Sequence, residues 1–185
     1  MTALLVLDAS VAMALVRAED SSARVRDALG RWATDGVSLI VPAPFWAEIV
    51  NSLTKRHGRS GAAVIEALFE LDQLSIATVE VDRPLLLAGL DLVERHGLTI
   101  HDALYLALAR SLGARLATFD RELVAAGGAD IVAIWDDRPP ERRGHDLRET
   151  RAPYGRVAER PVTWPTWPGA GAYLATLRRL AMADS

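Results

Sequence analysis

The order of apolar segments predicts an α/β fold with a mostly parallel sheet. Short apolar runs of strand length alternate with longer segments of helical periodicity, which is the pattern of strands joined by helical crossovers. The first run, Leu4–Leu7, is continuously apolar, as expected of a parallel strand that is buried on both faces. The 185 residues, half of them hydrophobic, suit one domain with an appendage.

The first half of the chain gives two strands and four helices. The first strand ends at Asp8, and we expect Ser10 to cap the next helix. A second helix ends near Gly36, and the β-branched run 37–41 predicts the second strand. The two prolines that follow close this strand, because proline cannot donate to a ladder. Helices are then expected over 45–55 and 62–74, on either side of a glycine-containing basic turn.

The second half continues the alternation. Residues 76–81 predict a strand, and 84–96 predict a helix that Asp82 begins and Gly97 ends. In the next helix leucines recur at a spacing of four from Leu104, and Gly113 is a typical helix end. A strand over 114–118, a short helix over 122–126 and a last strand over 131–134 complete the expected elements.

The composition changes beyond the last expected strand. We therefore divide the chain into a domain over residues 1–136 and a C-terminal extension over 137–185. The extension is rich in Pro, Arg and Trp, and 171–183 is predicted to be a short helix that ends it. Trp164 and Trp167 could grip RNA by stacking, but we favour packing on the domain or on a second subunit.

Composition also excludes several classes of protein. There is no cysteine, so the chain has neither a disulfide nor a thiolate metal site. No apolar run is long enough to span a membrane, and the N-terminus lacks the basic region of a signal peptide, so we expect a cytoplasmic protein. The net charge of −3 does not exclude a nucleic-acid substrate, because carboxylates that hold a cation do not repel phosphate.

Four acids stand at the boundaries of predicted elements. Asp8 follows the first strand, Glu48 lies in the first turn of the helix after Pro44, Asp102 begins a helix, and Asp120 follows a strand. The carboxyl ends of parallel strands open onto one crevice, so these acids can converge there. Crowded carboxylates need a cation, and Mg²⁺ prefers oxygen ligands and supports phosphoryl chemistry. Taken singly, each acid could instead cap a helix or favour its dipole.

At these positions the chain resembles PIN-domain ribonucleases of the toxin class found in VapBC toxin–antitoxin modules. The resemblance rests on LDAS at 7–10, Glu48 with Asn51 three residues on, TIHDA at 99–103 and ATFD at 117–120. These motifs occur in the family's order over about residues 1–135, whereas the extension matches nothing known in the family.

The resemblance implies a three-layer α/β/α fold and endonucleolytic RNA cleavage that depends on Mg²⁺, with Mn²⁺ as a substitute. Asp8 and Asp102 would be the main metal ligands, and Glu48 and Asp120 would complete the acidic ring directly or through water. The remaining family positions would be hydrogen-bond partners that orient carboxylates or water, namely Ser10, Asn51 and Thr118.

The resemblance also implies partners. These are an RNA substrate, a cognate antitoxin, a second copy in a homodimer, and operator DNA reached only through the antitoxin. Two alternatives stay open: a catalytically silent PIN-fold binding module, and a haloacid-dehalogenase-like phosphatase, which Ser10 disfavours because such enzymes carry a second acid there. We interpret the basic turn 55–59 as a solvated loop, with phosphate guidance as the alternative.

Overall fold

The computed structural model describes residues 3–17 and 22–133, and it has the predicted α/β architecture. The strands are β1 (Leu4–Leu7), β2 (Ser38–Pro42), β3 (Ala77–Val79), β4 (Arg115–Thr118) and β5 (Ile131–Ala133). The helices are α1 (Ala9–Val16), α2 (Ser22–Thr34), α3 (Pro44–Asn51), α4 (Gly61–Asp72), α5 (Arg83–His96), α6 (Ile100–Ser111) and α7 (Arg121–Gly127). A π-helical turn, η1 (Ser52–Arg56), continues α3, and a 3₁₀ turn, η2 (Gly128–Asp130), precedes β5. The extension over 137–185 and its expected helix lie outside the described residues.

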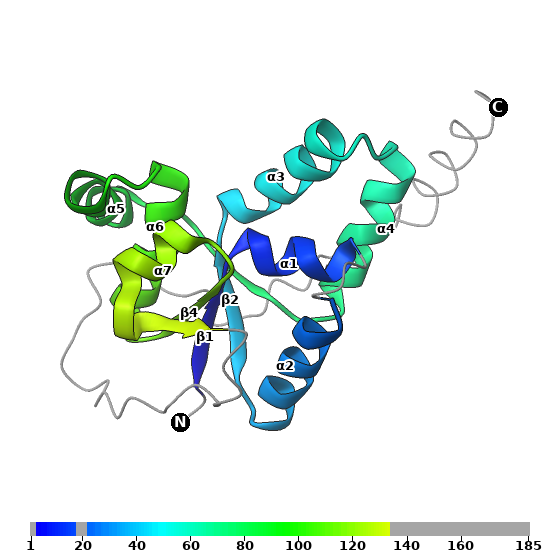
Figure 1. Cartoon of the computed structure of the whole chain (residues 1–185), viewed down its shortest axis with the longest axis horizontal. Helices are drawn as coiled ribbons and strands as arrows, with labels where there is room; N and C mark the ends of the chain where they lie inside the picture. Colours follow the sequence, from blue (N-terminus) through cyan, green and yellow to red (C-terminus); the bar gives the residue numbers. More distant parts are fainter. Residues whose placement is uncertain (1–2, 18–21, 134–185) are drawn as a thin grey trace.

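One sheet has the strand order β3-β2-β1-β4-β5, and every neighbouring pair is parallel. Figure 1 shows α1 to α4 on one side of the strands and α5 to α7 on the other. The central strand β1 is therefore covered on both faces, and Leu5, Val6 and Leu7 are fully buried. This burial explains why the first strand is apolar at every position.

The last hydrogen bond between β1 and β4 fixes the position of Asp8. The Asp8 amide donates to the Ala117 carbonyl of β4 at 3.0 Å, so the two central strands end side by side. On the other face of the sheet, α6 packs against β1, β2 and β4, and α5 packs on α6. Gly89 permits this approach, because a Cβ there would lie 3.2 Å from Ile100 Cδ1.

Three local expectations were wrong. Asp8, not Ser10, caps α1, because Asp8 has the extended backbone of a cap and its carboxylate accepts from the Ser10 amide. The helix expected over 45–55 divides into α3 and the π turn η1, a change of hydrogen-bond period that apolar spacing does not reveal. Pro42 lies within β2, at the last paired position opposite Val79, rather than beyond the strand.

Within residues 3–17 and 22–133, no helix combines the length and apolar character that crossing a bilayer requires.

Candidate active site

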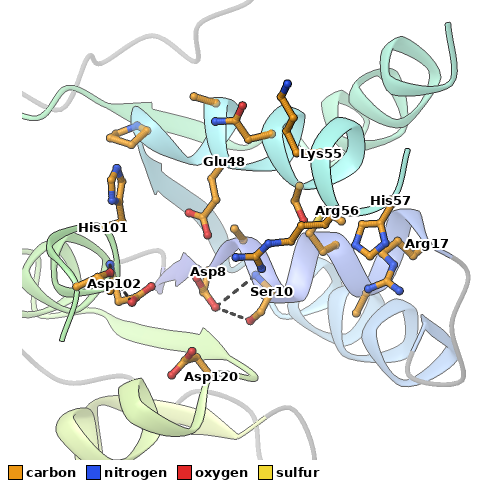
Figure 2. Close-up of a pocket in the computed structure, with 18 residues that line it drawn as sticks. Asp8, Ser10, Arg17, Glu48, Lys55, Arg56, His57, His101, Asp102 and Asp120 are labelled. Atoms are coloured by element: carbon orange, nitrogen blue, oxygen red, sulfur yellow. Dashed lines mark hydrogen bonds between the residues drawn. The ribbon is translucent and has the colours of Figure 1, made fainter. Parts of the chain in front are cut away.

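The four predicted acids line one pocket of about 710 Å³. Asp8 comes from the end of β1, Glu48 from α3, Asp102 from the first turn of α6 and Asp120 from the end of β4. Figure 2 shows their carboxylates around the same opening. The parallel sheet brings these segments together because β1 and β4 are neighbours that end at the same edge.

Asp8 is the most buried of the four acids, with 3% of its surface exposed. The pKa of its carboxyl is raised from 3.8 to about 6, chiefly by burial and also by the negative charge of Glu48. Hydrogen bonds from the Ser10 and Thr118 hydroxyls oppose this shift. The carboxylate is therefore held in place at an electrostatic cost that a bound cation would remove.

Two hydroxyls fix the Asp8 carboxylate and tie it to the end of β4. The Thr118 hydroxyl donates to Asp8 Oδ2 at 2.7 Å and accepts from the Asp120 amide at 2.9 Å. The Ser10 hydroxyl also donates to Asp8 Oδ2 and accepts from the Phe119 amide at 3.0 Å. Ser10 and Thr118 thus stand where the sequence analysis expected orienting partners.

Asp102 and Asp120 form hydrogen bonds at helix N-termini and also line the pocket. Thr99 caps α6 by accepting from the Asp102 amide at 3.2 Å, and its hydroxyl donates to Asp102 Oδ2 at 2.5 Å. Asp120 caps α7 by accepting at Oδ1 from the amides of Glu122 and Leu123. The capping roles weighed for these acids are therefore real, and they coexist with a position in the pocket.

Glu48 lies in the second turn of α3, not in the first as expected, because the helix begins at Pro44. Its Oε2 accepts a hydrogen bond from the Tyr105 hydroxyl at 2.9 Å. Tyr105 is 1% exposed, and burial together with the charges of Glu48 and Asp8 holds the pKa of its hydroxyl far above the ordinary value. Tyr105 therefore keeps its proton and is a fixed donor to Glu48.

The helical pattern of the sequence places Tyr105 only beside the apolar face of its helix and does not reveal this contact. A signal was available, since Tyr105 follows Asp102 by three residues and so shares a helix face with it. Asn51 is exposed and lines the pocket, but no hydrogen bond within the described residues joins its side chain to a carboxylate. Its orienting role stays a prediction.

Basic side chains form another part of the pocket wall. Arg17, Lys55, Arg56 and His57 line it, together with His101 near Asp102 (Figure 2). Lys55 and Arg56 belong to the π turn, so the first two residues of this segment are helical rather than loop, while residues 55–58 are exposed, in agreement with the solvated segment that was predicted. Leu53 is the buried residue of the turn.

The donors present suit a hard divalent cation, because all four are carboxylates. The charge of Glu48 also disfavours the ionised form of Asp8, and a bound cation would offset that repulsion. Among the residues that the structure describes, no three His, Asp or Glu side chains already form a compact metal-binding group. Binding a cation would therefore require side-chain adjustment, which the half-exposed Glu48, Asp102 and Asp120 allow. Mg²⁺ stays a prediction.

Comparison with known proteins gives consistent matches. The PIN domain family matches residues 5–129. Ribonuclease VapC3 of Pyrobaculum aerophilum is 32% identical over an alignment of 126 residues that covers 64% of this chain and 91% of that relative. The crystal structure of PAE2754, also from Pyrobaculum aerophilum, is 27% identical with a TM-score of 0.53 and covers 70% of this chain and 83% of that one.

Two more distant structures share the fold. VapC20 of Mycobacterium tuberculosis, described as a toxin that cleaves the sarcin-ricin loop, has a TM-score of 0.55 at 22% identity and covers 66% of this chain and 95% of its own. A toxin–antitoxin complex from Klebsiella pneumoniae gives a TM-score of 0.54 at 19% identity, covering 72% of this chain and 98% of that chain.

Proposed function

This chain belongs to the PIN-domain family as a VapC-like member, and from that premise we propose that it is a metal-dependent endoribonuclease, the toxin of a toxin–antitoxin module. One observation carries the proposal. Four carboxylates from separate segments of the chain line one pocket at the edge where β1 and β4 end. Family membership also argues against the haloacid-dehalogenase-like alternative.

Asp8 and Asp102 would hold the cation, Mg²⁺ or Mn²⁺, and Glu48 and Asp120 would complete the ring directly or through water. A cation bound there would lower the pKa of a water molecule and neutralise charge on the phosphate. Asp8, whose pKa is raised to about 6 in the metal-free site, would become fully ionised on binding. The hydroxyls of Ser10 and Thr118 hold Asp8 Oδ2 in place for that contact.

Tyr105 would hold the Glu48 carboxylate in place in the same way. Its hydroxyl donates at 2.9 Å from a position that is fully enclosed, so it limits the directions in which the Glu48 carboxylate can turn. Partners of this kind alter metal affinity or activity by roughly 10- to 100-fold when they are removed.

The proposal includes partners. The substrate is RNA, and uncontrolled cleavage of RNA requires a cognate antitoxin that blocks the pocket. The Klebsiella pneumoniae relative was solved as a toxin–antitoxin complex, which supports such a partner here. We further propose a homodimer, a cytoplasmic location and contact with operator DNA only through the antitoxin.

A silent PIN-fold binding module is the second candidate, favoured by the lack of a compact three-ligand group in the described residues. Calorimetric titration with Mg²⁺ and Mn²⁺, paired with cleavage of a mixed RNA pool with and without EDTA, separates the two. We expect binding and cleavage by the wild type, and loss of both in Asp8→Asn and Asp102→Asn. Asp91→Asn, on the exposed side of α5, is the matched control. A folded wild type that binds no metal and cuts no RNA would establish the silent module instead.

A further inference from the structure

We propose that Lys55, Arg56 and His57 form a basic rim that binds backbone phosphates of RNA beside the acidic end of the pocket. This inference rests on the proposed function, since it assigns the acids to the scissile phosphate and the rim to neighbouring phosphates. All three residues line the same pocket as the four carboxylates.

The π turn brings Arg56 and His57 to the pocket side of the helix. In a continuous α-helix, the nine residues from Glu48 to His57 would turn about 100° each, and His57 would point about 180° away from Glu48. Across η1 the hydrogen bonds span five residues, as in the 3.2 Å bond from the His57 amide to the Ser52 carbonyl, so each residue turns by less. The wider turn rotates Arg56 and His57 back toward the Glu48 side of the helix, whereas Lys55, seven residues from Glu48, is close to that face in either helical form; all three line the pocket.

The side chains around η1 stabilise this geometry. The Thr54 hydroxyl donates to the Val50 carbonyl at 2.8 Å, at the junction where the α-helical pattern changes. Leu53 is fully buried and anchors the turn from its inner side. Gly58 ends it with a φ of +59°, a left-handed conformation that glycine adopts without strain.

The charges of the rim are available for a ligand. Lys55, Arg56 and His57 are exposed, and within the described ranges no ion pair or side-chain hydrogen bond engages them. In Figure 2 the Arg56 guanidinium extends from η1 toward Ser10 and Asp8. Cations that stand next to carboxylates without pairing with them suit an anion that enters between them.

The spacing fits a polynucleotide rather than a single phosphate. Glu48 and Arg56 are eight residues apart along one helical segment, which is roughly 12 Å of helical rise. Successive phosphates of a duplex strand advance by about 3.4 Å along its axis, and a more extended single strand advances further per nucleotide. Because the Arg56 side chain reaches back from its backbone position toward Asp8, the rim can contact phosphates from the one next to the acids to one a few nucleotides away.

Fluorescence anisotropy of a labelled oligouridylate tests the proposal, with the full chain in Ca²⁺ buffer at several KCl concentrations and a gel to verify intact RNA. Each phosphate contact that is lost should reduce the slope of log K against log salt by about 0.7. We expect Arg56→Gln to lose one contact and weaken binding about threefold at low salt, Lys55→Gln/Arg56→Gln to lose two, and Arg56→Lys to retain most of the slope. Arg24→Gln, an exposed arginine on α2, is the control and should match the wild type.

Cleavage assays in Mg²⁺ separate this proposal from the proposed function. With an active wild type, the double variant should raise KM while kcat stays within about twofold. A wild type that cuts no RNA in any metal, yet shows the charge-dependent slope, would refute the nuclease and leave the rim standing. An unchanged slope in the folded double variant would overturn the rim. Tighter Mg²⁺ binding by the double variant without a change in slope would also overturn the rim, since Lys55 and Arg56 would then only offset the negative charge of the carboxylates.

Discussion

Replacing Asp8 by Asn should make the metal-free protein more stable at neutral and alkaline pH while it abolishes metal binding. The pKa of Asp8 is 3.8 in a model peptide and about 6 in the folded chain. A difference of roughly two units corresponds to about 3 kcal/mol of folding free energy. Asn also exchanges charge-assisted hydrogen bonds from Ser10 and Thr118 for neutral ones, so we expect a net gain of about 1 to 3 kcal/mol.

The sign follows from the raised pKa. Between about pH 4 and pH 6 the folded chain keeps a proton on Asp8 that the unfolded chain has lost, so the free energy of unfolding falls as pH rises. This contribution is fully present below about pH 4 and is lost once the pH exceeds about 6. The advantage of Asp8→Asn should therefore be small near pH 4 and reach its full size near pH 8.

Urea unfolding in EDTA at a series of pH values measures the effect. Glu48→Gln should reduce the pH dependence in part, because the charge of Glu48 contributes to the raised pKa of Asp8. Asp91→Asn, in an exposed ion pair with Arg95, should leave the wild-type pH profile unchanged. Saturating Mg²⁺, at about 100 times its Kd, should stabilise the wild type by about 2.7 kcal/mol and not the variant. A variant less stable than the wild type near pH 8, or a difference independent of pH, would refute the reasoning.

Four further substitutions test the neighbourhood of the site and the packing. Tyr105→Phe removes the donor to Glu48 and should lower metal affinity at least tenfold, as measured by calorimetry. The free energy of unfolding should fall by about 1 kcal/mol. Unchanged metal affinity would show that Tyr105 only fills space in the core. Thr118→Val leaves the Asp120 amide without its acceptor and removes one of the donors to Asp8, so urea unfolding near pH 8 should show a loss of about 2 kcal/mol, and a neutral result would contradict the network. Gly127→Ala should cost about 1 to 3 kcal/mol, because the new Cβ would lie 2.7 Å from Ile131 Cγ1. Gly30→Ala, with nothing within 4 Å in the exposed middle of α2, should instead gain about 0.5 to 1 kcal/mol; equal effects of the two alanines would rule out the packing explanation.

Sequence patterns predicted the sheet and the four acids because these depend on local rules. A strand covered on both faces must be apolar throughout, so Leu4–Leu7 could be recognised without knowledge of its neighbours. Thr99, Asp82 and Asp120 occupy cap positions that short-range hydrogen bonding dictates. Parallel strands leave their carboxyl ends at one edge, so acids that follow β1 and β4 had to meet.

The tertiary structure alone decided the long-range partners of Asp8 and Glu48 and how far each acid is buried. Tyr105 reaches Glu48 across 57 positions of sequence, and Thr118 reaches Asp8 across 110, so no periodicity could relate them. The π turn that aims Arg56 at the pocket depends on the packing of Leu53 and the back-bonding of Thr54 rather than on helix propensity. The sequence by itself determined the chemistry that meets at the sheet edge, because residue type and the place of an acid just after a predicted strand are local properties. Packing decided the electrostatics, because desolvation depends on everything that surrounds a group.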